Sequence, residues 1–368
     1  MVRVLYNDIN SSVLVNLHTT KRFKCDRGVR QGCPISPFLF LLAVELLSLN
    51  ILQNPTLKGI SVFGKEFKIS QLADGTTLFL KDQNQILLSI QIIQSFSEAS
   101  GLYLNLSKCE LFCLYDTQQT SIHNFPVKDC IKYLGISITK DRSIRQHLNF
   151  SPKIKKTRII FNSWLQRDLS IYGRVLISKA EGLSRCVYPA LSLFVSDKIV
   201  VEINKMLLNF IWKNKSHKIR KSVLSNRRSE GGLEVLDFKE LVSSFRISWL
   251  KKCLRSNDSI WYYIPNTIFC ILGGLDFLLK CNFTPSKLPI SLSNFHQQAL
   301  LAWKLCYVHN FSPHKEILWN NSCILIRGMS LFIEKWYDRG IVFVLDLFKD
   351  DGTILYYEEF MILYNLPL

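Results

Sequence analysis

ISQLADGTTLFL, residues 69–80, is the stretch that decides the fold of the N-terminal third of this sequence. It consists of two apolar, β-rich arms around the break Ala73-Asp74-Gly75. An Asp-Gly pair between two extended runs is a strong β-hairpin signal, because both residues tolerate a positive φ. The stretch therefore predicts a hairpin with Asp74 at its tip.

The segments on either side of this hairpin predict further helices and strands. Residues 38–52 are apolar almost all round, which is typical of a helix that is buried on most sides. An amphipathic helix is expected over residues 84–99, with Gly101 in its C-cap. Residues 102–106 and 111–114 are expected to be extended. The first part of the chain is therefore predicted to be α/β.

The charge of the chain is concentrated in its middle third. The 368 residues carry a formal net charge of +17. Residues 141–260 hold 24 basic and 10 acidic side chains, a net charge of +14, whereas residues 1–140 carry +4 and residues 261–368 carry −1. Such a focus is the footprint expected for a polyanionic partner. With a mostly helical pattern after residue 141, the sequence predicts three parts with these boundaries.

Cysteine content and apolar runs bear on the compartment and on other partners. The eleven cysteines are an odd number, so they cannot form a complete set of intrachain disulfides. We interpret them as reduced thiols of a cytoplasmic or nuclear protein without a disulfide-linked partner.

The longest apolar stretch, residues 37–52, is interrupted by Glu45, Ser48 and Asn50. It is too short and too polar to span a bilayer, so no membrane partner is expected.

Four motifs follow one another along the first part of the chain. They read RGVRQGCPISPFLF (27–40), LADGTTLF (72–79), SGLYLNLSKCE (100–110) and KYLGI (132–136). In this order they resemble the second half of the palm of a reverse transcriptase, in the form found in LINE-type (non-LTR) retrotransposons. Three later stretches resemble the region after the palm in vertebrate elements of this type: residues 169–189, 210–215 and 231–238.

The resemblance implies an RNA-directed DNA polymerase whose partner is RNA or DNA, held as a template–primer duplex. Residues 1–140 would be a partial reverse transcriptase palm, a mixed sheet with helices. Residues 141–260 would be a basic, mostly α-helical thumb-like region. Residues 261–368 would be a mixed C-terminal segment of a LINE-type polyprotein.

Asp74 is the residue that the resemblance places at the catalytic metal site. Nucleotidyl transfer needs two divalent cations, Mg²⁺ in this family, which are held by carboxylates. Asp74 matches the first Asp of the usual x-A-D-D hairpin, whereas Gly75 stands in place of the second and Leu72 in place of an aromatic residue. The upstream Asp motif is missing, since Asp8 and Asp26 lie outside the expected context. One carboxylate cannot hold two Mg²⁺ ions, so metal binding is expected to be weak or lost and the chain inactive.

Other residues take a role from the same motifs. Arg30, Gln31 and Gly32 match positions that contact the incoming nucleotide and the template, and Lys108 matches a lysine near the triphosphate. The primer-grip turn is matched by Tyr133, Leu134 and Gly135. Each of these matches has a plainer interpretation. Residues 30–32 could form an ordinary loop, Lys108 could be a solvated side chain, and residues 133–135 could be a strand with a glycine bulge. Without its motif, Asp74 would be an ordinary hairpin residue.

Basic residues of the middle third are the candidates for phosphate binding. In the first run the basic residues alternate with apolar residues of a predicted helix. In the second run they come directly after Trp212, and proteins that bind single-stranded nucleic acids combine basic and aromatic residues in this way. The residues are Lys153, Lys155, Lys156, Arg158, Lys213, Lys215, Lys218, Arg220 and Lys221. The plainer alternative is the solvated face of a helix.

Three functions remain open from the sequence. The first is a reverse transcriptase by descent, expected to be inactive because its hairpin reads Leu72-Ala73-Asp74-Gly75 and the upstream Asp motif is missing. The second is a non-catalytic nucleic-acid-binding protein. The third is a pseudogene product without a function. Primer extension separates the first from the others, and salt-dependent binding separates the second from the third.

Overall fold

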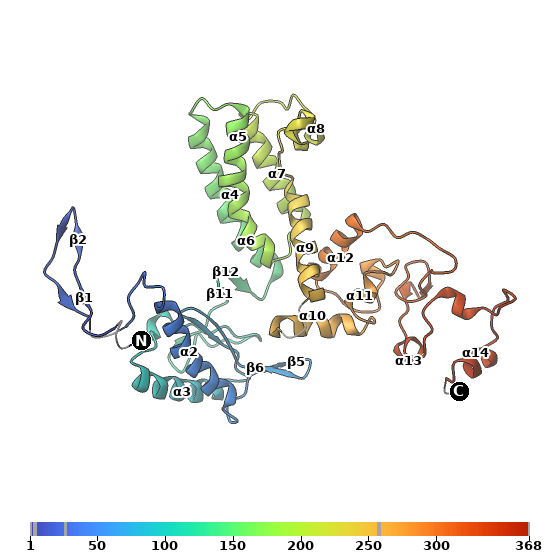
Figure 1. Ribbon diagram of the computed structural model, residues 1–368, viewed down its shortest axis with the longest axis horizontal. Helices are drawn as coiled ribbons and strands as arrows, with labels where there is room; N and C mark the ends of the chain where they lie inside the picture. The colour runs from blue at the N-terminus through green and yellow to red at the C-terminus, as the bar shows by residue number, and fades with distance from the viewer. Residues whose placement is uncertain (1, 3–5, 26–27, 256–258, 367–368) are drawn as a thin grey trace. The chain divides into compact units, whose positions relative to one another are not determined.

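The computed structural model describes residue 2 and residues 6–25, 28–255 and 259–366. Within this part the chain divides into two compact units, Met1–Lys128 and Asp129–Leu368, which we call the N-terminal and C-terminal units (Figure 1). Both units contain helices and strands, so the chain is a mixed α/β protein, as predicted.

The N-terminal unit holds short strands and two long helices. Its elements are β1 (Asn10–Ser11), β2 (Leu14–Val15), β3 (His18–Thr19), β4 (Phe23–Lys24), α2 (Ser36–Gln53), β5 (Ile60–Val62), β6 (Lys65–Phe67), β7 (Ile69–Leu72), β8 (Gly75–Leu78), α3 (Asn84–Ser100), a 3-10 turn (Leu106–Lys108), β9 (Ser121–Ile122) and β10 (Phe125–Pro126). The described strands pair two by two and antiparallel: β1 with β4, β2 with β3, β5 with β6, β7 with β8 and β9 with β10.

Two extended segments expected from the sequence do not form strands. Residues 102–106 and 111–114 have no strand, apart from an isolated bridge between Leu111 and Val127. An extended segment becomes a strand when a neighbour supplies a ladder of hydrogen bonds, and here the ladder is a single bridge. The predicted helix 84–99 is confirmed as α3, and Gly101 ends it with a φ of 72° and an N–H donated to Ser97 O.

Helix α2 is less buried than its sequence suggests. Leu47 and Ile51 pack with Leu57 and the α3 residue Phe96 in the core of the unit. The other apolar positions are exposed or only half-buried, and Leu42, for example, is 68% exposed. The prediction of a helix buried on most sides is therefore wrong, because the described elements cover one face of it. Helix α2 is also long and apolar enough to cross a membrane, and 22% of its 18 residues are buried. Core helices of soluble proteins can have the same length and composition.

The C-terminal unit is mostly helical. Its elements are β11 (Cys130–Tyr133), β12 (Ile136–Thr139), α4 (Arg142–Leu165), α5 (Ile171–Ile177), a π-helix (Ser178–Leu183), α6 (Ser184–Ser192), α7 (Asp197–Ile211), α8 (Lys221–Ser225), a 3-10 turn (Arg228–Glu230), α9 (Phe238–Arg255), α10 (Ile260–Cys270), α11 (Leu275–Leu278), a 3-10 turn (Pro285–Lys287), α12 (Asn294–Cys306), β13 (Leu325–Ile326), β14 (Met329–Ser330), α13 (Glu334–Tyr337), a 3-10 turn (Val344–Leu347) and α14 (Tyr357–Leu363).

Helix α4 begins at Arg142, directly after its capping residue Asp141. The Asp141 side chain caps it by accepting hydrogen bonds from Ser143 N at 2.6 Å and Ile144 N at 3.0 Å. Those two N–H groups would otherwise have no partner in the first helical turn. The Ser143 hydroxyl also donates to Asp141 Oδ1 at 2.7 Å, and this bond, followed by the two backbone bonds, lowers the pKa of Asp141.

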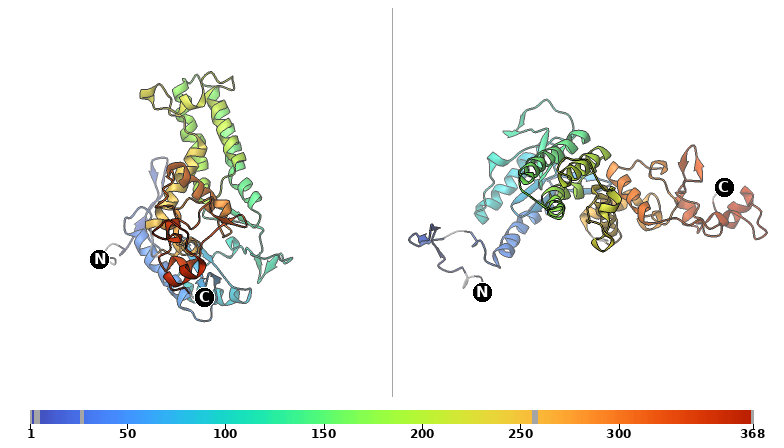
Figure 2. Two further views of the ribbon diagram at one scale, coloured as in Figure 1. Left: turned by 90° about the vertical axis from the view of Figure 1, so that its right-hand side faces the viewer. Right: turned by 90° about the horizontal axis from the view of Figure 1, so that it is seen from above.

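Helices α4, α6, α7 and α9 share one apolar core, and the views in Figures 1 and 2 draw α4, α6 and α7 side by side. At its centre the rings of Phe161 and Phe210 stack with centroids 4.0 Å apart. The π-helix brings Gly182 against this pair, where an added Cβ would lie 2.7 Å from the Phe161 ring. Glycine is therefore the residue that lets these helices approach closely.

Candidate functional site

Strands β7 and β8 form the hairpin that the sequence predicts. Their register runs from Ile69 paired with Leu78 to Leu72 paired with Gly75, which leaves Ala73 and Asp74 at the tip. The positive φ belongs to Ala73, at 52°, and not to Asp74 or Gly75. The turn is therefore one residue earlier than the Asp-Gly signal implied, although the position of Asp74 at the tip is confirmed. The Asp74 side chain is exposed.

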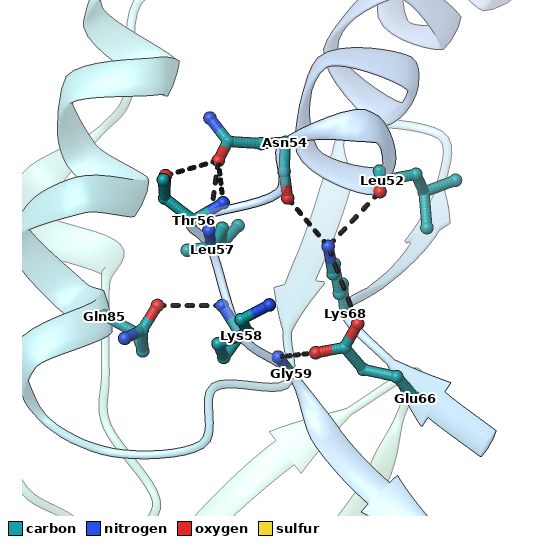
Figure 3. A network of polar contacts seen from close by, with 9 residues as sticks. All are labelled: Leu52, Asn54, Thr56, Leu57, Lys58, Gly59, Glu66, Lys68 and Gln85. Carbon is teal, nitrogen blue, oxygen red and sulfur yellow. Dashed lines mark hydrogen bonds and ion pairs between the residues drawn. The ribbon is translucent and has the colours of Figure 1, made fainter. Parts of the chain in front are cut away.

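Lys68, at the start of this hairpin, attaches it to the C-terminal end of α2 (Figure 3). The Lys68 side chain is buried and donates from Nζ to Leu52 O at 3.3 Å and to Asn54 O at 2.9 Å. These carbonyls lie at the end of a helix, where a cation is favourable. The carboxylate of Glu66 lies 3.6 Å from the same Nζ and completes the charge balance.

The chain that joins α2 to β5 is fixed by the side chains around Lys68 (Figure 3). Asn54 Oδ1 accepts from Thr56 N at 2.9 Å and from Leu57 N at 3.0 Å. Glu66 Oε1 accepts from Gly59 N at 2.7 Å, and this bond is the main cause that lowers the pKa of Glu66. The start of the hairpin is thus held by hydrogen bonds at several points.

The position of the tip follows from two contacts along β7. Lys68 reaches residues 52–54 of α2, and three residues later Gln71 accepts a hydrogen bond from Ser48 Oγ. The strand therefore runs along α2 toward the helix N-terminus. The strand ends at Leu72 and the chain turns back through Ala73 and Asp74, so the tip lies one to two strand residues, about 3–7 Å, beyond Gln71 in that direction. The hairpin tip thus points to the end of α2 at which residues 30–32 enter.

Residues Arg30, Gln31 and Gly32 form an exposed loop before α2. The Arg30 carbonyl accepts from Cys33 N at 3.3 Å and from Ser36 Oγ at 2.6 Å, which closes the loop onto the helix. Gly32 has a φ of 85°, a conformation that glycine adopts without strain. Asp26 and Arg27, at the start of this motif, lie outside the described residues.

The described residues do not assemble a Mg²⁺ site around Asp74. In residues 6–25, 28–255 and 259–366, there is no group of three or more His, Cys, Asp or Glu side chains that could hold a metal. Mg²⁺ demands octahedral coordination by several oxygens, so one exposed carboxylate does not fit it. Lys108 is exposed at the end of its 3-10 turn, and no bond among the described residues joins it to Asp74.

Tyr133, Leu134 and Gly135 belong to the C-terminal unit. Tyr133 ends β11 and pairs with Ile136 of β12, so Leu134 and Gly135 form a two-residue turn. Their φ values are 46° and 82°. The motif is therefore a tight hairpin and not a strand with a glycine bulge.

The basic residues of this unit fall into two classes. Of the nine that the sequence predicts to bind phosphate, three pair with carboxylates: Arg158 with Glu202 at 2.8 Å, Lys213 with Asp168 at 3.4 Å, and Lys221 with Asp237. The others have no carboxylate partner among the described residues: Lys153, Lys155, Lys156, Lys215, Lys218 and Arg220. These six can meet a polyanion without first breaking an ion pair.

The six basic residues without a carboxylate partner lie at different points along the length of α4. Lys155 and Lys156 are exposed near the middle of the helix, opposite the buried Ile154 and Thr157. The loop with Lys215, Lys218 and Arg220 lies near the far end, because Lys213 pairs with Asp168 just beyond α4. Helix α4 has 24 residues and is therefore about 36 Å long.

Several residues that shape these sites carry no signal in the sequence. Lys68 is an ordinary surface residue by its context, and buried Arg246 of α9 is another. The Arg246 guanidinium donates to Ala190 O at 2.9 Å, Leu193 O at 2.6 Å and Gln298 Oε1 at 3.0 Å, while burial lowers its pKa to about 10. Their partners lie far away in the chain, so no local pattern could have identified them.

Comparison with known proteins bears on the identity of the chain. Residues 2–138 match the family model described as reverse transcriptase (RNA-dependent DNA polymerase). The Transposon TX1 uncharacterized 149 kDa protein of Xenopus laevis is 25% identical over 266 residues, 70% of this chain and 20% of that protein. The Retrovirus-related Pol polyprotein from type-1 retrotransposable element R2 of Popillia japonica is 34% identical over 91 residues, 24% of this chain and 12% of that protein. The chain thus spans a small part of the length of both relatives.

Proposed function

We propose that this chain, which belongs to the reverse transcriptases of non-LTR retrotransposons, holds the template–primer duplex of an RNA-directed DNA polymerase. One observation carries the proposal. The six basic side chains without carboxylate partners lie on α4, and beyond it, in the part of the chain that has a net charge of +14. We place its action in the cytoplasm or the nucleus, where such a duplex occurs.

The dimensions of α4 support a duplex as the ligand. Its length of about 36 Å is comparable to one turn of B-form DNA, about 34–36 Å. Lys155 and Lys156 in its middle, and the loop 213–221 beyond its end, then meet phosphates on one side of the duplex. In this proposal, residues 141–260 act as the thumb and residues 1–140 are the remnant of the palm.

If the chain binds phosphates, the removal of basic residues should make its affinity for the duplex less dependent on salt. Each phosphate contact contributes about 0.7–0.9 to the slope of log K against log salt. Lys155→Gln with Lys156→Gln in the full chain should flatten the slope for a short RNA–DNA hybrid by about 1.4–1.8. Fluorescence anisotropy over a salt series measures it.

The control removes the same charge elsewhere. Lys335 and Arg339 are exposed in the segment 261–368, which has a net charge of −1. Lys335→Gln with Arg339→Gln should leave the slope within error of the wild type. Equal slopes in all three proteins would mean that Lys155 and Lys156 are a solvated helix face.

Catalysis is the second candidate, favoured by the family. Reverse transcriptases use divalent metals such as Mg²⁺, which activate the primer hydroxyl and neutralise the triphosphate. Asp74 followed by Gly75 does not fit this pair of ions, so we assign no catalytic step to the chain. We expect primer extension with Mg²⁺ or Mn²⁺ to be no higher than that of an Asp74→Ala variant. Extension above that control would establish a polymerase.

A further inference from the structure

The end of the helical bundle at which α4 finishes carries planar side chains in pairs (Figure 1). The Arg167 guanidinium lies over the Trp164 ring, 4.7 Å from the ring centroid. The Arg228 guanidinium lies 5.7 Å from the centroid of the Tyr172 ring, on α5. Tyr172 is 51% exposed, so about half of this side chain remains open to a further partner. Guanidinium groups and aromatic rings attract other flat groups by dispersion and by the charge distribution of the ring.

A third pair lies in the basic loop after α7. The His217 ring stacks on Trp212, with centroids 6.3 Å apart and 28° between the planes. Trp212 packs against an apolar cluster that also supports Ile171, the neighbour of Tyr172. The loop and the start of α5 therefore rest on the same small core.

Contacts between the helix ends keep the three pairs together. Arg174 Nε of α5 donates to Ile211 O, at the end of α7, at 2.6 Å. Lys213 Nζ lies 3.4 Å from a carboxylate oxygen of Asp168, the residue after Arg167. We call the six paired side chains the aromatic tip: Trp164, Arg167, Tyr172, Trp212, His217 and Arg228.

The chain around the aromatic tip is strongly basic. Residues 164–174 and 211–230 hold nine basic and two acidic side chains. Proteins that bind unpaired strands combine such charges, which meet the phosphates, with flat side chains, which stack with the bases. Bases inside a duplex are already stacked on one another, so only unpaired bases can lie against these side chains. The aromatic tip thus fits a single strand and not the duplex itself.

We propose that the aromatic tip binds the bases of an unpaired strand that extends from the duplex held along α4. Its planar groups stack with bases of the strand, and the basic side chains of the loop 213–221 neutralise the phosphates between them. Stacking requires only a flat base, so RNA and DNA strands of any sequence fit the site. The inference rests on the proposed function, because the strand continues the same duplex.

The test compares three probes by fluorescence anisotropy with the full chain. All contain the same RNA–DNA hybrid. One is blunt, one carries about six unpaired nucleotides at each end, and one carries the same extensions built from abasic nucleotides. The abasic extensions keep the phosphates and lack the bases, so the difference between the two extended probes measures base contacts alone.

Three variants assign this difference to the aromatic tip. Tyr172→Ala removes the ring, whereas Tyr172→Phe keeps it. The matched control is Tyr356→Ala, because Tyr356 is also exposed and has a cation, Lys349 Nζ, 5.4 Å from its ring centroid. Tyr356 belongs to the segment 261–368, which has a net charge of −1.

We expect the wild type, Tyr172→Phe and Tyr356→Ala to bind the extensions with bases more tightly than the abasic ones. Tyr172→Ala should lower this preference by about fivefold or more, the usual loss when one stacking ring is removed. Its affinity for the blunt hybrid, its salt slope and its melting temperature should stay unchanged, since Tyr172 is uncharged and exposed. Extensions of RNA and of DNA should give the same preference.

The blunt hybrid tests the proposed function, and the two extended probes test this inference. If the wild type does not bind the blunt hybrid, the proposed function fails and the inference fails with it. If the wild type binds the blunt hybrid but does not distinguish the two extensions, the inference is wrong and the proposed function stands. If Tyr172→Ala keeps the preference, or Tyr356→Ala loses it equally, the bases do not stack on the aromatic tip. A preference confined to RNA would assign it to the 2′-hydroxyl groups and overturn stacking as its basis.

Discussion

Helices α2 and α7 are both rich in apolar residues, but they meet their surroundings differently. In α7 the apolar residues recur every three or four positions, and Ile203, Leu207 and Phe210 are fully buried. In α2 they occur all round, and Phe38 and Leu42 are exposed. Apolar content alone therefore did not indicate burial, whereas periodic spacing did. A helix that is apolar on every side needs neighbours on every side, and the described elements supply them on one.

Different interactions stabilise the interior of each of the two units. The C-terminal unit centres on stacked rings and close helix contacts, with Phe161 and Phe210 at its middle. The N-terminal unit has a smaller apolar core around Leu47 and Ile51, and polar bonds from Lys68 and from Ser48 to Gln71 also hold the C-terminal part of α2. Hydrogen bonds contribute about 1 kcal/mol each after competition with water, and less than the burial of a large aromatic side chain.

The largest expected effect is the loss of the aromatic stack. Phe161→Ala should lower the free energy of unfolding by about 3–5 kcal/mol, because it removes a buried ring and leaves a cavity. Leu42→Ala, at an exposed position of α2, should change it by less than about 0.5 kcal/mol. Denaturant unfolding followed by far-ultraviolet circular dichroism measures both, because all seven tryptophans lie in the C-terminal unit and do not report on α2. A Leu42→Ala loss as large as that of Phe161→Ala would show that the outer face of α2 is covered in solution, and would break the comparison.

The sequence predicted those parts of the fold that depend on local pattern. The hairpin at 69–80, helix α3 and its Gly101 cap follow from alternation, amphipathic spacing and turn chemistry, which act over a few residues. The failures came where a distant partner decides. Residues 111–114 lack a ladder, and α2 lacks cover on its outer face. The turn around Asp74 was misplaced by one residue because Ala73, an unusual choice for a positive φ, takes that conformation.

The candidate site shows the same contrast between features that depend on local sequence and features that depend on distant residues. Motifs located Asp74, the loop 30–32 and the turn Leu134-Gly135, because each depends on neighbouring residues. The groups that hold them came from elsewhere in the chain: Lys68 binds carbonyls of α2, and the Tyr188 hydroxyl donates to Leu134 O. Charge counting located the basic region but could not tell which side chains are paired. That needed the positions of acidic partners such as Glu202, 44 residues from Arg158.

The smallest expected change in stability comes from charges on the outer face of α2. Phe38, Leu42, Leu46 and Leu49 recur every three or four residues, so they form one exposed stripe. Such a stripe, in a unit whose described strands pair only two by two, favours aggregation and hydrophobic dye binding. Leu42→Glu with Leu46→Glu should reduce both in the full chain, with little effect on unfolding, since neither side chain contributes to the core.

The matched control for this variant lies on the same helix. Leu47 is buried against Ile51 and Phe96, so Leu47→Glu places a charge in the core. It should unfold the N-terminal unit and increase dye binding, because an unpaired charge cannot stay in an apolar core. Dye fluorescence and sedimentation, read beside thermal melting, separate the two variants. Loss of stability with Leu42→Glu and Leu46→Glu would mean that this stripe packs against something in solution, and that α2 is as fully buried as its sequence predicts.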